Sequence, residues 1–145
     1  MQTSAIPNLS NSTLLELPSG VKIPNYNRSN LTGGIVHIGL GNFHRAHQSW
    51  YLHRLMQQGK AHDWAIIGAG VKEFDKAQRL KLLAQDFLTT LVELSPVGRT
   101  VEVVGSMIDY VPIEANNGPL IAQMAKPEIK IVTLTVTEGG YYIDP

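Results

Sequence analysis

Residues 33–42 read GGIVHIGLGN, and this stretch decides the fold class. Its apolar centre predicts a short buried strand, which ends in a Gly-x-Gly turn at Gly39 and Gly41. From residue 43 to about 58, apolar side chains recur with the period of a helix. A second apolar run at 64–67 predicts another strand. A strand, a glycine turn, a helix and a strand in this order are typical of the βαβ unit of a parallel sheet.

The rest of the chain extends this unit and adds one departure from it. Residues 75–85 and 118–125 have the composition of helices, and 129–137 predicts a strand that is apolar on both faces and therefore central. Two further runs, 87–94 and 99–104, flank a turn that contains proline and glycine and predict a β-hairpin. We therefore expect an α/β fold, a Rossmann-like, doubly wound and mostly parallel sheet with an inserted β-hairpin.

Composition limits the classes of partner. Twelve basic and twelve acidic side chains give a formal net charge of zero, which provides no long-range attraction for nucleic acid or an anionic membrane. The chain has no cysteine, which excludes disulfides and thiolate metal ligands. No apolar stretch approaches the roughly 20 residues that cross a bilayer, and the first residues lack the pattern of a secretory signal. We expect a cytoplasmic protein with no nucleic-acid or membrane partner.

The glycine turn is the first candidate for a binding site. Gly39 allows the chain to bend sharply, and Gly41 lets the backbone approach a pyrophosphate, whose charge then meets the amides at the helix start. His44 stands where the usual fingerprint has a third glycine. The alternative is a tight turn between strand and helix that binds no ligand.

A carboxylate after the second strand would bind the ribose hydroxyls of NAD. Glu73 and Asp75 are the two candidates, although both lie further along the chain than the usual spacing. Asp75 is equally suited to be a helix N-cap. Lys72 and Lys76 lie close by and could accept the 2′-phosphate of NADP, so that NADP stays an alternative to NAD.

Three polar side chains, His44, Arg45 and His47, follow the turn. The two histidines have a spacing that could place two metal ligands on one helix face, but no third ligand is evident and we expect no metal. We expect the three groups to face the pyrophosphate or the helix surface, with Arg45 offsetting phosphate charge. The other histidines are expected in the core at His37 and at the surface at His53 and His62.

The last predicted strand ends in Thr137, Glu138, Gly139 and Gly140. An acid before two glycines suits a place where backbone approaches a ligand, and Glu138 could pass a proton or bind a hydroxylated substrate. The alternative is an ordinary exposed turn. Together these patterns predict a polar arm over residues 1–30 and a dinucleotide-binding domain over residues 31–145.

Three ordered blocks resemble the long-chain mannitol dehydrogenase family. The first is IGLGNFHRAHQ at 38–48, the second lies at 84–94, and the third is IVTLTVTEGGY at 131–141. The resemblance implies zinc-independent, NAD(P)-linked oxidation of a polyol, D-mannitol to D-fructose, by an enzyme that is a monomer. It implies cofactor contacts at Gly39, Gly41, Asn42, Phe43, Arg45, Asp75, Thr137, Glu138 and Gly139, with Asp75 selecting NAD and Glu138 near the substrate.

The resemblance also implies that the family's catalytic lysine and helical substrate domain lie beyond residue 145. We therefore expect a truncated domain that does not turn over substrate by itself. Fructuronate and tagaturonate reductases share the Phe-His-Arg-Ala-His core and are the alternative. The Gly139-Gly140 pair favours the polyol branch, whose substrate is a polyol or ketose. A nucleotide-binding module without catalysis is the remaining alternative.

Overall fold

The structure, a computed structural model, describes residues 8–136 and is built on a four-stranded parallel sheet. The strand order is β6-β3-β2-β7, and each neighbouring pair runs parallel. The chain therefore crosses over between every pair of strands, as the glycine turn and the following helix predict. The strands are β2 (Gly33–Ile38), β3 (Ala65–Ala69), β6 (Met107–Tyr110) and β7 (Ile131–Leu134).

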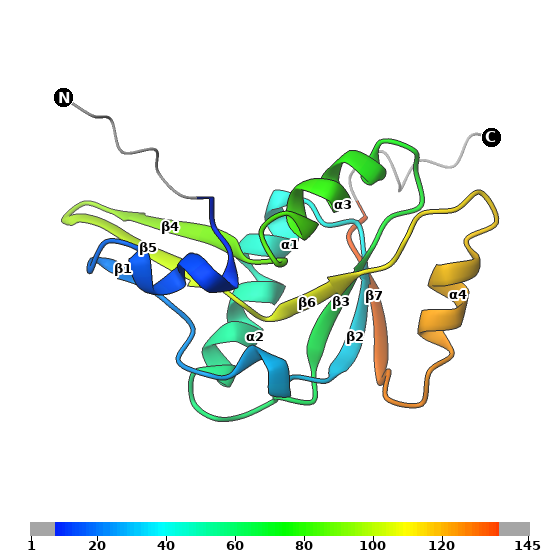
Figure 1. Cartoon of the computed structure of the whole chain (residues 1–145), viewed down its shortest axis with the longest axis horizontal. Helices are drawn as coiled ribbons and strands as arrows, with labels where there is room; N and C mark the ends of the chain where they lie inside the picture. The colour runs from blue at the N-terminus through cyan, green and yellow to red at the C-terminus, as the bar shows by residue number, and fades with distance from the viewer. Residues whose placement is uncertain (1–7, 137–145) are drawn as a thin grey trace.

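Apolar side chains alternate between the two faces of this sheet, and helices cover both. Ile35 and Ile66 point into a core that includes Leu52 and Leu82. Val36 and Ile67 point to the opposite face, into a second core that includes Leu120. In Figure 1, α4 lies on the far side of the sheet from α2. The helices that supply these cores are α2 (Gln48–Met56), α3 (Asp75–Leu83) and α4 (Gly118–Met124).

The predicted hairpin is confirmed. β4 (Thr89–Ser95) pairs antiparallel with β5 (Gly98–Val104), and Ser95 lies opposite Gly98 at the turn. Gly98 has φ +145°, a conformation that would be strained for a residue with a side chain. β1 (Val21–Lys22) adds a short parallel strand to β5. The hairpin projects away from the four-stranded sheet (Figure 1).

Three elements differ from the sequence-based expectation. The helix predicted from residue 43 is broken at His47 into α1 (Asn42–Ala46) and α2. At the break the backbone of His47 has φ −120° and ψ −87°, and its ring Nδ1 bonds to the Phe43 carbonyl at 2.8 Å. β6 was not predicted, since a four-residue strand with an aspartate carries almost no periodic signal. β7 is not covered: Leu134 is 59% exposed, and among the described residues β7 pairs only with β2.

Arg28 attaches the segment before β2 to the edge of the sheet. Its guanidinium donates to the carbonyl oxygens of Asp86, Gly105 and Met107 at 2.7–3.0 Å. These bonds join the segment before β2 to the end of α3 and to the β5–β6 connection. Two 3-10 helices, Asn11–Glu16 and Arg28–Asn30, lie in this segment.

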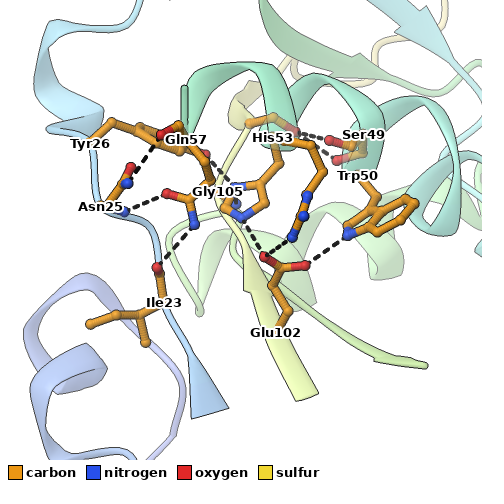
Figure 2. Close-up of polar contacts among 11 residues, drawn as sticks. Ile23, Asn25, Tyr26, Ser49, Trp50, His53, Gln57, Glu102 and Gly105 are labelled. Carbon is orange, nitrogen blue, oxygen red and sulfur yellow. Dashed lines mark hydrogen bonds and ion pairs between the residues drawn. The ribbon is translucent and has the colours of Figure 1, made fainter. Parts of the chain in front are cut away.

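A buried polar network completes the attachment (Figure 2). His53 Nδ1 lies 2.7 Å from the Tyr26 hydroxyl and 3.4 Å from the Gly105 amide, which can only donate. Nδ1 is therefore the acceptor, and the proton sits on Nε2, 3.4 Å from Glu102. The Trp50 indole N–H also donates to Glu102, at 2.8 Å.

His53 was expected at the surface, and that expectation is wrong: it is 0% exposed. Ser49, Leu52, His53 and Met56 form the buried face of α2, so helical periodicity could have placed His53 inside. Among residues 8–136, no helix is long and apolar enough to cross a membrane.

Candidate functional site

The glycine turn lies at the carboxyl end of β2 and opens toward solvent. Gly39 has φ +92°, which a side chain would strain. Gly41 has an ordinary φ of −74° and is the N-cap of α1. Among residues 8–136, no atom outside Gly41 and its chain neighbours lies within 4 Å of the position that a Cβ of Gly41 would occupy. The backbone is therefore bare and accessible where a ligand would approach.

The first amides after the turn have no helical acceptor because α1 begins there. The first α1 amide with a carbonyl acceptor one turn earlier is that of Arg45, which donates to Gly41 at 3.2 Å. The amides of Asn42, Phe43 and His44 precede it and have no such acceptor within the helix. Amides of this kind attract a negatively charged group.

Beneath the turn, two histidine rings stack on one another. The His37 and His44 rings have centroids 3.6 Å apart and planes at 13°. Both side chains are buried, and His44 is only 2% exposed. Burial, together with the neighbouring His37, lowers the pKa of His44 to about 3, so the ring is neutral at pH 7. The expectation that His44 faces the pyrophosphate or the helix surface is wrong, because its ring packs against β2.

Asp75 stands at the end of the neighbouring strand β3. Its Oδ2 accepts the amides of Val71 and Lys72, each at 3.0 Å, and holds the loop that follows the strand. Asp75 is itself the first residue of α3, and Phe74 is the N-cap, so the N-cap expectation is wrong. Because β2 and β3 are parallel neighbours, with Ile38 opposite Ala69, Asp75 and the glycine turn lie at the same edge of the sheet.

The other carboxylate candidate is occupied elsewhere. Glu73 is exposed and pairs with Lys76 at 2.9 Å. Lys76, which could have accepted a 2′-phosphate, is thereby directed toward Glu73. Of the two acids, Asp75 is the one that the loop holds in place.

Arg45 and the residues around it lie on the side of α1 that faces β4. Arg45 bonds to the Asn42 side chain and lines a cavity of about 310 Å³ with Thr89 and Thr90. Phe43 is 66% exposed and stacks on the His47 ring, with centroids 4.2 Å apart. His47 is exposed whereas His44 is buried, so the two do not share a face. Within residues 8–136, no three His, Cys, Asp or Glu side chains are grouped to bind a metal.

Three predicted site residues, Thr137, Glu138 and Gly139, lie outside the described residues. The strand that leads to them is described and bears on the site. Thr133 and Thr135 direct their hydroxyl groups to the His37 ring, at 2.7 and 3.2 Å. β7 is therefore joined to the glycine turn through His37.

The geometry agrees with comparisons to known proteins. The family model described as the mannitol dehydrogenase Rossmann domain matches residues 33–144. The chain belongs to the mannitol dehydrogenase family. The Rossmann-like α/β fold with helices on both faces, predicted from the sequence, is thereby confirmed.

Several relatives in this family are mannitol 2-dehydrogenases. The protein of Cereibacter sphaeroides is 56% identical over 121 residues, which are 83% of this chain and 25% of that protein. That of Aspergillus fumigatus (strain Af293) is 49% identical over 123 residues, 84% of this chain and 24% of that protein. The chain thus spans about a quarter of the length of these relatives.

Two solved structures share the fold. The ternary complex of Pseudomonas fluorescens mannitol 2-dehydrogenase with NAD and D-mannitol has a TM-score of 0.87 and 43% identity, and the match covers 95% of this chain and 28% of that one. Substrate-free D-sorbitol dehydrogenase has a TM-score of 0.79 and 38% identity, over 94% of this chain and 28% of that one.

Proposed function

We propose that this chain forms the dinucleotide-binding part of an NAD-dependent mannitol 2-dehydrogenase, which converts D-mannitol to D-fructose. The observation that carries the proposal is the bare turn at Gly41, open to solvent at the same sheet edge as Asp75. The similarity to a mannitol 2-dehydrogenase that binds NAD and D-mannitol supports it. We propose a domain of residues 31–145, with residues 1–30 as an arm on its surface.

The proposal gives each part of the site a role. The turn and the first residues of α1 would bind the diphosphate through backbone amides, and Arg45 would add positive charge. Asp75 would bind the ribose hydroxyl groups, and its negative charge would disfavour a 2′-phosphate, hence NAD rather than NADP. NAD supplies the hydride acceptor when bound. The proposed cofactor contacts are Gly39, Gly41, Asn42, Phe43, Arg45, Asp75, Thr137, Glu138 and Gly139, with Glu138 also near the substrate.

A titration of the chain with NADH tests the proposal. Gly41→Ala places a methyl group in the open turn, where the unliganded fold has room for it and loses less than about 1 kcal/mol at the N-cap. We expect the wild-type chain to bind NADH and Gly41→Ala to bind at least about tenfold more weakly, since the methyl group obstructs the diphosphate.

Gly20→Ala is the matched control. A Cβ at Gly20 also meets no atom of the described residues within 4 Å, but Gly20 lies in the N-terminal segment, before β2. We expect this variant to bind NADH as the wild type does. Equal NADH affinity in Gly41→Ala and the wild type would contradict the proposal, as would a wild-type chain that binds no NADH.

A further inference from the structure

The His37 ring holds the carbonyl of the glycine turn. Its Nε2 lies 3.2 Å from both the Gly39 carbonyl oxygen and the Thr135 hydroxyl. Because the carbonyl oxygen can only accept, we place the proton on Nε2, where these two oxygens share it. Nδ1 is then the acceptor for the Thr133 hydroxyl at 2.7 Å. Gln48 lies 3.4 Å from the same hydroxyl and donates to it. A directed chain of hydrogen bonds thus runs from α2 through β7 and β2 to the first glycine.

This bond and the bond from the Gly41 amide, at 3.0 Å, together hold the direction of the peptide that joins Gly39 to Leu40. In a trans peptide the C=O and the N–H point to opposite sides, and the structure contains no cis peptide among its described residues. Because the Gly39 carbonyl points inward to His37, the Leu40 amide points outward. Gly39 also has φ +92°, a conformation in which glycine meets little steric resistance to a flipped peptide. The Gly39 carbonyl has two donors, the Gly41 amide at 3.0 Å and the His37 ring at 3.2 Å, and the His37 ring is the one that a side-chain substitution can remove.

His44 in turn holds the His37 ring. The two rings lie face to face at 3.6 Å, and His44 reaches down from α1 while His37 belongs to β2. No hydrogen bond of ordinary geometry reaches either ring nitrogen of His44 among the described residues, and the contact with the Gln48 side chain only partly offsets the lowering of its pKa. Its contribution is thus the flat face of the ring, which restricts rotation of His37 about its side-chain bonds.

We propose that His37 and His44 are positioning residues that direct the Leu40 amide outward for the diphosphate of the cofactor. The inference rests on the proposed function and extends it to two residues beneath the turn. In the usual fingerprint a third glycine lets the helix approach the strand. Here an aromatic stack fills that place and orients the turn from below.

Three substitutions separate stacking from hydrogen bonding. His37→Phe keeps a ring for the stack but removes the donor to Gly39, and we expect NADH to bind about tenfold more weakly. His44→Leu keeps bulk but loses the ring face, and we expect binding about fivefold weaker. His44→Phe keeps the face and loses only nitrogens that no hydrogen bond of ordinary geometry reaches among the described residues, so affinity should return to within about twofold of the wild type.

A buried histidine elsewhere provides the control. His53→Leu disturbs a core of similar burial away from the turn, and the affinity of the folded chain for NADH should not change. Circular dichroism establishes the folded fraction of each variant at low temperature. If His37→Phe does not fold, the NADH affinities of His44→Leu and His44→Phe test the inference by themselves. Wild-type affinity in folded His37→Phe, or equal affinities in the two His44 variants, would overturn the inference.

Nuclear magnetic resonance of the His37 ring separates this inference from the proposed function. We expect the proton on Nε2, and we expect the Leu40 amide resonance to shift when NADH is added. A ring protonated on Nδ1 instead overturns the positioning role whether or not NADH binds. A wild-type chain that has the expected tautomer but binds no NADH overturns the dinucleotide proposal and, with it, the role of His37 and His44 toward a cofactor.

Discussion

Asp75 combines two tasks in a single carboxylate. One oxygen holds the loop after β3 through two amides, and no hydrogen bond from the described residues reaches the other oxygen, Oδ1. Asp75→Asn keeps an oxygen for the loop but removes the charge. We expect NADH to bind about tenfold more weakly in this variant and the preference for NADH over NADPH to fall, because the carboxylate no longer repels a 2′-phosphate.

Titrations with NADH and NADPH measure both effects. Glu73→Gln is the matched control, since Glu73 is an exposed acid two residues away that pairs with Lys76. This variant should keep the wild-type affinity and preference. If Asp75→Asn still prefers NADH over NADPH, a group other than Asp75 recognises the ribose.

Buried neutral histidines make the stability of the fold depend on pH. Burial lowers the pKa of His37 and His53 and lowers that of His44 to about 3. In the unfolded chain these rings take up protons near pH 6.5. The unfolded state thus binds more protons below that pH, and the free energy of unfolding falls progressively as the pH drops from about 6.5 toward 3.

Urea unfolding between about pH 7.5 and about pH 5 measures this dependence. We expect the midpoint to fall across this range in the wild type. His44→Phe removes the buried histidine whose pKa is lowered to about 3, so its midpoint should fall less steeply. Identical slopes in the two proteins would show that His44 does not resist protonation in the fold.

The sequence predicts the glycine turn of the site but not the two stacked histidines beneath it. Gly39 and Gly41 follow from their spacing between a strand and a helix, whereas Asp75 lies beyond the usual spacing and was singled out by the family resemblance. His44 was expected to face outward, since sequence alone does not reveal that the helix breaks at His47. The stack with His37 depends on the distance between α1 and β2, and no local pattern encodes that distance.

At the scale of elements, the βαβ unit and the hairpin were predictable because their apolar residues repeat with a clear period. β6 and the break between α1 and α2 were not. Four residues provide too few repeats for a strand, and no local pattern marks the turn of the backbone at His47. Pairing of β1 with β5 joins segments about 80 residues apart, which no local signal predicts.

The attachment of the N-terminal segment to α2 depends on His53. His53→Leu leaves the Tyr26 hydroxyl without its acceptor and takes the ring N–H away from Glu102, which keeps its bonds to Trp50 and Arg54. We expect the free energy of unfolding to fall by about 2 kcal/mol and proteolysis before β2 to become faster. Tyr26→Phe removes only one hydroxyl and should cost about 1 kcal/mol.

Urea unfolding and limited proteolysis report these two effects separately. The Gly105 amide still donates to His53 in Tyr26→Phe, so the ring remains partly held. Equal losses in the two variants would show that His53 contributes nothing beyond its bond to Tyr26.

For the molecule as a whole, the exposed strand β7 determines how the chain behaves in solution. Ile131, Val132 and Leu134 are each more than 40% exposed, and within residues 8–136 the outer edge of β7 has no neighbouring strand. An exposed apolar edge offers its backbone groups to another sheet. The net charge of zero adds no repulsion between chains. We therefore expect the 145-residue chain to self-associate as its concentration rises.

Val132→Lys tests whether β7 is the contact. A lysine on an edge strand opposes pairing between sheets and adds charge, and we expect light scattering to show a smaller average mass at the same concentration. Val97→Lys adds the same charge at the tip of the hairpin, where Val97 is 97% exposed, and is the matched control. An equal decrease in both variants would attribute self-association to net charge, whereas a decrease confined to Val132→Lys would locate it at β7.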